Sequence, residues 1–261
     1  SEIIDNIVEK GSIVLNKDNK FFSLLSTKAK DKKINVISFS KNKRADIYLI
    51  SVKKNRKYNR LKLNIMNKIF YFDVKHSTEN FIENILAAVS VLNFLGVDLT
   101  KLQKVFTNFE IPSGRGDIKI IKKFNKKFKF IDESYNANPL SMISAIKNMN
   151  YYKKEKKQKN LVFLGDMLEL GKKSKQLHIS LSKEINKSNI DKIYVYGKNI
   201  KETYKSVSSQ KRGMIFYSLN EAYNHFSKIL DNNDLLMVKG SNATGLNRFS
   251  KIIKKGQIGV I

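Results

Sequence analysis

Four short polar segments of the sequence hold side chains that can do chemistry. The most polar of them is DESYNANP, which runs from Asp132 to Pro139 at the end of a predicted strand and the start of a predicted helix. Asn138 and Pro139 suit the N-cap and the first turn of that helix. Helix capping does not account for Asp132 and Glu133, because carboxylates at a strand end can accept ribose hydroxyls or reach a metal. We therefore interpret the octapeptide as part of a binding site.

A glycine-flanked arginine precedes the octapeptide. The segment SGRG sets Arg115 between two glycines, which let a backbone approach a ligand closely. A guanidinium in such a place can bind phosphate oxygens through two parallel hydrogen bonds. A surface arginine in a hinge explains this segment equally well, so the motif alone leaves both interpretations open.

Two further segments, LGDMLELG (164–171) and VKGS (238–241), also follow predicted strands. Turn chemistry with a helix cap could explain the first, and a plain strand-to-helix turn could explain the second. Each is weak alone, but ligands of parallel sheets bind where the strands end. We therefore add their polar residues to the candidate site: Asp166, Glu169, Lys239 and Ser241.

The second half of the chain alternates apolar strands with amphipathic helices. This alternation predicts a Rossmann-like α/β fold, with a mostly parallel sheet and helices on both faces. The predicted strands are 128–133 as the first, then 161–164, 192–196, 214–217 and 235–238. The predicted helices are 139–152, 177–185, 221–230 and 246–253.

The first half has a different order of elements, and we place a domain boundary at about residue 112. This predicts one α/β domain at 1–112 and a second at 113–261. The predicted strands of the first domain are 13–15, 35–39, 46–52, 61–66 and 69–74. Its predicted helices are 21–28, 79–95 and 99–106, of which the second is strongly apolar.

The formal net charge of +27 is the most unusual feature of the composition. All but six of the 50 basic residues are lysines, and they occur in every segment together with abundant Asn and Ile. Nucleic-acid surfaces favour arginine, so we interpret the charge as compositional bias and predict no nucleic-acid partner.

The sequence has no cysteine, no apolar run of membrane-spanning length and no signal-peptide pattern at its start. We therefore predict a cytoplasmic protein that does not insert into membranes.

Several well-known signatures are missing from the sequence. It holds no G-x-x-x-x-G-K-[ST] phosphate loop, no G-x-G-x-x-G fingerprint and no G-x-S-x-G elbow. Its histidines, His76, His178 and His225, are far apart and lack metal-ligand spacing, so we predict no metal site in this chain. His178 lies among core residues of a predicted helix, where a structural role is the usual one.

The four segments, in this order, resemble the carboxy-terminal domain of the Mur ligases. The resemblance rests on Gly114-Arg115, DESYNANP, LGDMLELG, His178 and Lys239-Gly240-Ser241. The first half is similar to the later part of the family's central ATPase domain, through IVLNKDN (13–19) and through NILAA (84–88). Only the second asparagine of the family's H-N-x-x-N motif is present, as Asn84, since Asn80 is followed by Phe81. The resemblance covers essentially the whole chain.

Members of this family use ATP to form an acyl phosphate, which an amine then attacks to give an amide. DESYNANP resembles the members that add D-alanyl-D-alanine to UDP-N-acetylmuramoyl-tripeptide in peptidoglycan synthesis, with ATP and Mg²⁺ as cofactors. The resemblance implies Arg115 as the catalytic residue. It implies an ATP site of Asn84, Arg115, Asp132, Glu133, Tyr135 and Asn136. It implies substrate contacts by Asn138, Asp166, Glu169, Lys239 and Ser241.

The resemblance also implies that parts of the ligase lie outside this sequence. In the family, the phosphate loop, the Mg²⁺ ligands and the domain that binds the UDP-sugar would all precede residue 1. We therefore expect this chain alone to be an incomplete, inactive fragment, and a monomer. Closure of the carboxy-terminal domain on the nucleotide would assemble the site and exclude water.

Two other functions compete with this interpretation. The first is a related ATP-dependent ligase, such as another Mur ligase or a folylpolyglutamate synthase, and DESYNANP argues against it. The second is a basic α/β module that binds nucleic acid without catalysis. Such a module would interleave aromatic residues and arginines on one face, and the sequence predicts no such face.

Overall fold

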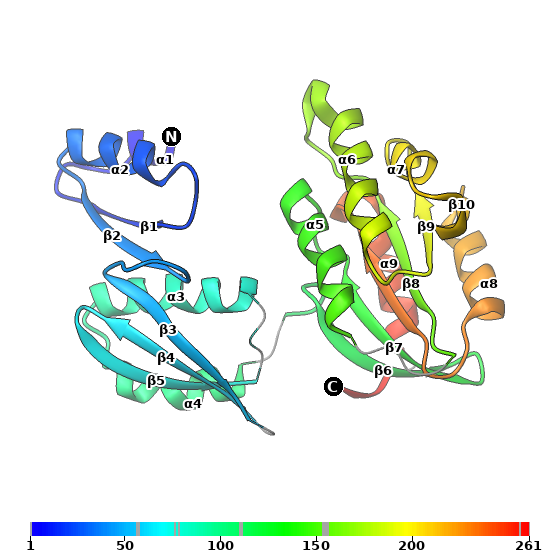
Figure 1. Cartoon of the computed structure of the whole chain (residues 1–261), viewed down its shortest axis with the longest axis horizontal. Helices are drawn as coiled ribbons and strands as arrows, with labels where there is room; N and C mark the ends of the chain where they lie inside the picture. Colours follow the sequence, from blue (N-terminus) through cyan, green and yellow to red (C-terminus); the bar gives the residue numbers. More distant parts are fainter. Residues whose placement is uncertain are drawn as a thin grey trace. The chain divides into compact units, whose positions relative to one another are not determined.

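The computed structural model describes residues 2–260, with gaps at 56–57, 76, 78, 110–111, 153–156 and 256. The chain forms two compact units, Ser1–Glu110 and Ile111–Ile261 (Figure 1). The predicted boundary at about 112 adjoins this division, and two of the residues beside it, 110 and 111, lie outside the described residues.

The first unit contains a mixed five-stranded sheet. Its strands pair in chain order, as β1 (Ser12–Asn16), β2 (Asn35–Ser40), β3 (Ile47–Lys54), β4 (Asn59–Ile65) and β5 (Lys68–Val74). The first three strands are parallel, and β3, β4 and β5 are antiparallel. The β4–β5 hairpin turns through Met66 and Asn67, both at positive φ, as two-residue hairpin turns require.

Helices of the first unit cover this sheet. They are α1 (Glu2–Asp5), α2 (Phe22–Asp31), α3 (Glu79–Phe94) and α4 (Leu102–Asn108), the last preceded by a 3₁₀ turn at Leu99–Lys101. The apolar residues of α3 recur at helical spacing as Ile82, Ile85, Leu86 and Val89. These side chains are buried against Leu61, Leu63 and Phe72 of the sheet. The long apolar helix predicted at 79–95 is thereby confirmed.

The second unit contains a seven-stranded sheet with the order β10-β9-β8-β11-β7-β6-β12. The strands are β6 (Asp117–Lys123), β7 (Lys126–Glu133), β8 (Asn160–Gly165), β9 (Lys192–Tyr196), β10 (Arg212–Phe216), β11 (Leu235–Lys239) and β12 (Gln257–Val260). The five strands from β10 to β7 in this order are parallel, whereas β6 pairs antiparallel with both β7 and β12. The predicted mostly parallel sheet is confirmed.

The prediction that 128–133 is the first strand of this sheet was wrong. The lysine-rich segment Asp117–Lys123 precedes it and forms a hairpin with β7, turning through Phe124 and Asn125 at positive φ. The alternation in DIKIIKK is partly hidden by lysines, whose long stems can cover apolar surface while their charges stay in water.

Helices cover both faces of the second sheet, as predicted (Figure 1). One face carries α5 (Pro139–Asn148), which continues into a 3₁₀ turn at Met149–Tyr151, together with α6 (Ser174–Lys187) and α7 (Ile200–Ser206). The other face carries α8 (Leu219–Ile229) and α9 (Leu246–Lys254). Helix α7 was not predicted, because its seven residues are mostly polar.

The order of the strands marks one edge of this sheet as the place for a ligand. Strand β11 lies between β7 and β8, and its chain continues to α9 on one face. Strands β7 and β8 continue to α5 and α6 on the other face. Connections therefore diverge at the carboxyl end of β11, and open α/β sheets bind ligands at such switch points.

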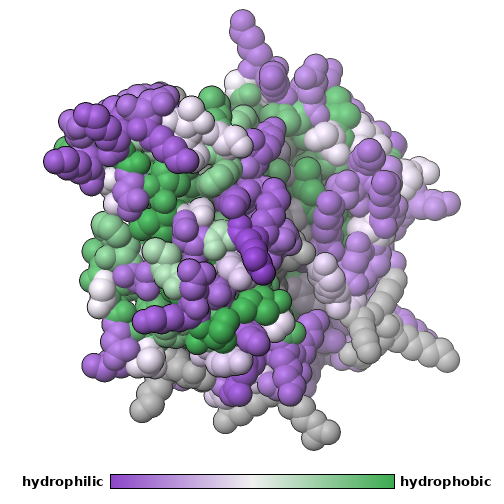
Figure 2. Space-filling model, turned by 60° about the vertical axis from the view of Figure 1, so that its left-hand side comes forward, coloured by the Kyte–Doolittle hydropathy of each residue, from purple (hydrophilic) through white to green (hydrophobic). Residues whose placement is uncertain are grey.

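The surface mixes polar and apolar side chains. Figure 2 shows hydrophilic residues spread over one face of the molecule, with hydrophobic patches between them. Within the described part of the chain, no helix has the length and apolarity needed to span a membrane.

Candidate functional site

Three of the predicted segments meet at the carboxyl ends of β7, β8 and β11. The ammonium of Lys239 lies 3.2 Å from Glu133 Oε2 and donates to the carbonyl of Asn136 at 3.1 Å. The hydroxyl of Ser241 donates to the carbonyl of Ala137 at 3.2 Å and accepts the Leu168 N–H at 3.0 Å. The three segments are thus joined by direct hydrogen bonds.

The arginine segment packs against the octapeptide through its two glycines, both at positive φ. A Cβ on Gly114 would lie 3.1 Å from the Cβ of Tyr135, and one on Gly116 would lie 2.7 Å from Glu133 Oε1. The Gly116 N–H donates to the Asp132 carbonyl at 2.8 Å, and the Tyr135 N–H donates to the Gly114 carbonyl at 3.1 Å. The glycines therefore permit a close approach between two segments of this chain.

This turn presents Arg115 to solvent at the sheet edge. Its guanidinium carbon lies 4.3 Å from the centroid of the Tyr135 ring, and 52% of Tyr135 is exposed. A cation held over an aromatic face is attracted by the negative charge of the ring face. The stack keeps the guanidinium at the site while its N–H groups stay available to an anion.

Asp132 is buried, with 1% of its surface exposed. One carboxylate oxygen accepts the N–H of Ser134 at 3.1 Å and its hydroxyl at 2.6 Å, and the other pairs with the ammonium of Lys254. Burial favours a higher pKa for Asp132, but the hydrogen bonds and charge of Lys254 and Ser134 outweigh it and lower the pKa. The carboxylate is therefore ionised and bonded within the protein.

Glu133 is the more accessible of the two acids, with 22% of its side chain exposed. It pairs with Lys239, of whose side chain only 2% is exposed. Burial, together with the negative charge of Glu133, raises the pKa of the nearby Tyr152 to about 12. Glu133 thus combines a buried cationic partner with partial access to solvent.

Asp166 bonds to the start of α7. Its Oδ1 accepts the N–H groups of Asn199 and Ile200 at 3.0 and 2.7 Å, and its Oδ2 accepts the Lys198 N–H at 3.0 Å. A carboxylate at a helix start satisfies backbone donors that have no partner within the helix. Asp166 thereby fixes the loop after β9 to the loop after β8.

His178 joins α6 to the loop after β8. Its Nε2 accepts the Met167 N–H at 3.0 Å, and its Nδ1 lies 2.8 Å from the Ser174 carbonyl. These contacts assign the proton to Nδ1, which donates to that carbonyl. The structural role predicted for His178 is confirmed.

Tyr135, Asn136 and Asn138 are the exposed residues of the octapeptide, whereas Ser134 and Ala137 are buried. Asn138 caps α5 by accepting the Ser141 N–H at 2.9 Å, while the Ser141 hydroxyl accepts the Asn138 N–H at 3.1 Å. The candidate residues therefore fall into two groups. The buried group consists of Asp132, Asp166, Lys239 and Ser241. The exposed or partly exposed group consists of Arg115, Glu133, Tyr135, Asn136, Asn138 and Glu169.

Asn84 belongs to the first unit, where it is exposed on α3. Its neighbour Glu83 belongs to a polar network that the sequence analysis missed. Asp18 accepts the Ser40 hydroxyl at 2.9 Å and the Lys41 N–H at 2.7 Å, and the Lys41 ammonium lies 3.3 Å from Glu83. Asp18 follows β1, and Ser40 ends β2. Their position at the ends of parallel strands was the signal that could have identified them.

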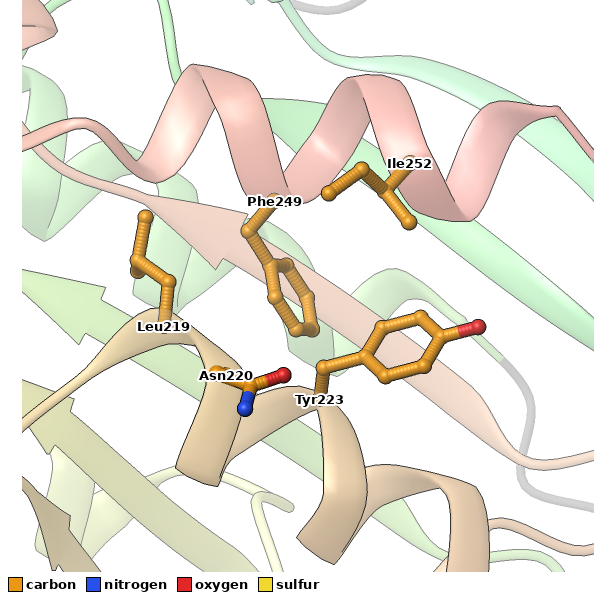
Figure 3. Close-up of a pocket in the computed structure, with 5 residues that line it drawn as sticks. All are labelled: Leu219, Asn220, Tyr223, Phe249 and Ile252. Atoms are coloured by element: carbon orange, nitrogen blue, oxygen red, sulfur yellow. The ribbon is translucent and has the colours of Figure 1, made fainter.

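An apolar pocket of about 270 Å³ lies between α8 and α9 (Figure 3). It is lined by Leu219, Asn220, Tyr223, Phe249 and Ile252. None of these belongs to the candidate site, and the set has no charged group to bind a nucleotide. Among the described residues, no cluster of three or more His, Asp or Glu side chains is arranged to hold a metal ion.

Comparison with protein families assigns both units to one family. The model of the Mur ligase middle domain matches residues 1–92, and that of the Mur ligase glutamate ligase domain matches residues 118–242. The chain therefore belongs to the Mur ligase family, and the resemblance inferred from the motifs is confirmed.

Within that family, the chain is similar to proteins named UDP-N-acetylmuramoyl-tripeptide–D-alanyl-D-alanine ligase. It is 26% identical to the one from Rickettsia prowazekii over 248 residues, which are 95% of this chain and 54% of the relative. It is 30% identical to the one from Buchnera aphidicola subsp. Baizongia pistaciae over 251 residues, 94% of this chain and 51% of the relative. The chain thus spans about half the length of the curated relatives it matches.

A solved structure shows the same fold. The crystal structure of MurF ligase from Thermotoga maritima in complex with ADP aligns with a TM-score of 0.76 at 20% identity. The alignment covers 98% of this chain and 56% of that chain. The likeness extends over both units.

Proposed function

We propose that the protein is an ATP-dependent ligase that joins D-alanyl-D-alanine to UDP-N-acetylmuramoyl-tripeptide in peptidoglycan synthesis. The observation that carries this proposal is the exposed Arg115, stacked on Tyr135 of DESYNANP at the switch point of the sheet. The similarity to two ligases of this name, over at least 94% of the chain, supports the choice of substrates.

The reaction couples ATP cleavage to the formation of an amide. The peptide carboxylate attacks the γ-phosphate of ATP, which gives an acyl phosphate and ADP. The dipeptide amine then attacks the acyl carbon, the C–O bond to phosphate breaks, and the amine loses a proton. Catalysis of phosphoryl transfer consists mainly of positioning and of neutralising charge. An exposed guanidinium at the site can supply the second of these.

The two groups of candidate residues suggest two roles. We propose that Arg115 contacts phosphate oxygens, and that Glu133, Tyr135 and Asn136 contact the nucleotide. For the first unit, we propose Asn84 as a nucleotide contact. Asn138 and Glu169 would contact the peptide substrates. The buried Asp132, Asp166, Lys239 and Ser241 would hold these contacts in place, because their polar atoms already bond within the protein.

The described residues fit part of the requirement for ATP and Mg²⁺. Arg115 suits a phosphate, and a partly exposed carboxylate such as Glu133 suits a ribose hydroxyl. Bound Mg²⁺ would neutralise phosphate charge, but the described residues hold no group of side chains arranged as its ligands. We therefore assign no Mg²⁺ ligand within them.

The test uses the longest polypeptide that the coding sequence specifies. It is incubated with ATP, Mg²⁺, UDP-N-acetylmuramoyl-tripeptide and D-alanyl-D-alanine, and both phosphate release and the mass of the product are measured. We expect phosphate and the pentapeptide product in equal amounts. Matched reactions replace the dipeptide with L-alanyl-L-alanine or with D-glutamate. Amide formation with D-glutamate and none with D-alanyl-D-alanine would contradict the proposal and favour another ligase of the family.

A further inference from the structure

The last residue of α9, Lys254, bridges two segments of the candidate site. Its ammonium donates to the hydroxyl of Ser113 and to the Oδ2 of Asp132, which are 141 and 122 residues away in the sequence. The Lys254 side chain is 15% exposed, and that of Asp132 is 2% exposed. A partly buried lysine at this place was not among the residues that the sequence analysis selected.

These two contacts lie at opposite ends of the turn that carries Arg115. Ser113 is the first residue of the SGRG segment. The backbone carbonyl of Asp132 accepts the N–H of Gly116, the last residue of that segment, at 2.8 Å. Lys254 therefore holds the start of the turn directly and its end through Asp132.

Contacts that fix the turn matter because the Arg115 side chain makes few contacts of its own. This side chain is exposed, and the contact that fixes it is the stack on Tyr135. Stacks of this kind at exposed sites are weak. The position of the guanidinium therefore depends on the backbone of the turn.

A buried carboxylate such as Asp132 requires a paired cation, since an unpaired buried charge is strongly destabilising. That requirement explains a lysine beside Asp132 but does not explain the second hydrogen bond to Ser113. The bond to Ser113 links the buried pair to an exposed loop. A residue that served stability alone would not need this link.

We propose that Lys254 is a positioning residue that fixes the Arg115 turn in the geometry needed to bind phosphate. This inference rests on the proposed function for the identity of the phosphate, but the fixing of the turn is a property of this chain alone. The two parts are therefore tested by separate measurements.

The first measurement is hydrogen exchange on the 261-residue chain without nucleotide. The amides of Gly116 and Tyr135 report on the turn, because both bond across it. The amides of Val162 and Met237 in β8 and β11 report on the core. In Lys254→Met we expect exchange at the turn to be faster by about tenfold or more, with the core amides within about twofold of wild type.

Two further variants sharpen this measurement. Lys251→Ala removes an exposed lysine of the same helix and should leave all four amides unchanged. Ser113→Ala removes the contact to the turn and leaves the Asp132–Lys254 pair intact, so it serves even if Lys254→Met does not fold. Wild-type exchange at Gly116 and Tyr135 in a folded Lys254→Met or in Ser113→Ala would overturn the proposal.

The second measurement is ligase kinetics with the longest encoded polypeptide. Lys254→Met should lower kcat, as Arg115→Ala does. The double variant should have a kcat no lower than that of Arg115→Ala alone. A lysine with a purely structural role would give independent, multiplying losses, which would overturn the proposal. An inactive wild type would contradict the proposed function and leave the exchange result standing.

Discussion

The guanidinium carbon of Arg115 lies 4.3 Å from the centroid of the Tyr135 ring, so the arginine turn and DESYNANP form one surface. Gly114 and Gly116 suit this contact, because a Cβ at Gly114 would lie only 3.1 Å from Tyr135 and one at Gly116 would collide with Glu133 Oε1 at 2.7 Å. The arrangement leaves Arg115 exposed to solvent at a switch point of the sheet. It is the arrangement expected of an anion-binding residue.

Replacing Arg115 should therefore affect the chemical step. We expect Arg115→Ala to lower kcat by on the order of 10², in the range for losing one donor that stabilises transition-state charge. Arg115→Lys should not restore full activity, because an ammonium cannot bind two oxygens in parallel. Steady-state kinetics of the ligase, with circular dichroism to confirm folding, measures both effects.

Arg248 provides the matched control for this experiment. It is an exposed arginine of α9, outside the proposed site. Arg248→Ala should leave kcat and kcat/KM within about twofold of wild type. Unchanged kinetics in a folded Arg115→Ala variant would show that the arginine is only a surface residue of the turn.

The two neighbouring acids should respond differently to substitution. Glu133 is partly exposed, so Glu133→Gln should raise the KM for ATP with little change in kcat if the carboxylate holds ribose equally in ground and transition states. The substitution also leaves the buried Lys239 without its counter-charge, so we expect Glu133→Gln to lose stability as well. An ATP titration of initial rates, with a melting curve for each protein, separates the two effects. A lower kcat at an unchanged KM would contradict a ribose contact.

Asp132 should instead control the pH dependence of stability. Because folding lowers the pKa of Asp132, the ionised pair with Lys254 stabilises the folded state above the unfolded-state pKa of about 3.9. This contribution is lost as the pH falls through the lowered folded-state pKa. Asp132→Asn should cost about 2–3 kcal/mol at pH 7, in the range for a hydrogen bond to a charged group. The difference from wild type should shrink below about pH 4.

Urea unfolding of the two proteins across this pH range measures that difference. Asp231→Asn is the control, since Asp231 also pairs with a lysine, Lys126, but at the surface. Exposed pairs of this kind contribute little to stability, so the control should follow the wild-type curve. A difference between Asp132→Asn and wild type that stays constant from pH 7 to pH 3 would refute the assignment.

The sequence predicted the fold well where hydrophobic periodicity was strong. The strands β8, β9 and β11 and the helices α3 and α9 lie within a few residues of their predicted bounds, because their buried faces impose a clear period. Strand β6 and helix α7 escaped prediction, since one is masked by lysines and the other is short and polar.

The sequence predicted which segments lie together at the candidate site, but not which of their side chains are buried and which are exposed. Segments that follow strands were grouped correctly by topology, because parallel strands end at one edge. Asp132 and Glu133 look alike in sequence, yet only the first is buried against Lys254, which lies 122 residues away. Asp166 likewise faces backbone N–H groups of a helix that was not predicted. Such long-range partners leave no local signal.

Because Asp166 is buried and Glu169 is exposed, substitutions of these two acids of LGDMLELG should affect different properties of the protein. Asp166→Ala leaves three backbone N–H groups without their acceptor, so it should cost on the order of 2 kcal/mol of unfolding free energy. Glu169 is exposed, and Glu169→Gln should change stability by less than about 0.5 kcal/mol. If Glu169 contacts the dipeptide amine, Glu169→Gln should raise the KM for D-alanyl-D-alanine. Chemical denaturation and initial-rate kinetics test the pair, and a stable Asp166→Ala would contradict the role given to Asp166.

The last prediction concerns the 261-residue chain by itself. Its sequence has no G-x-x-x-x-G-K-[ST] loop, whose backbone N–H groups and lysine bind the β- and γ-phosphates. Its described residues also provide no arrangement of Mg²⁺ ligands. Arg115 and Glu133 can contact a nucleotide but cannot by themselves orient its γ-phosphate for attack, and positioning is the main requirement of this chemistry.

We therefore expect weak ATP affinity and no turnover when the chain is incubated with ATP, Mg²⁺, UDP-N-acetylmuramoyl-tripeptide and D-alanyl-D-alanine. Phosphate release is compared with a reaction that lacks protein, and isothermal titration measures ATP binding. Phosphate release above that background, lost in Arg115→Ala and kept in Arg248→Ala, would show that the two units alone suffice for catalysis.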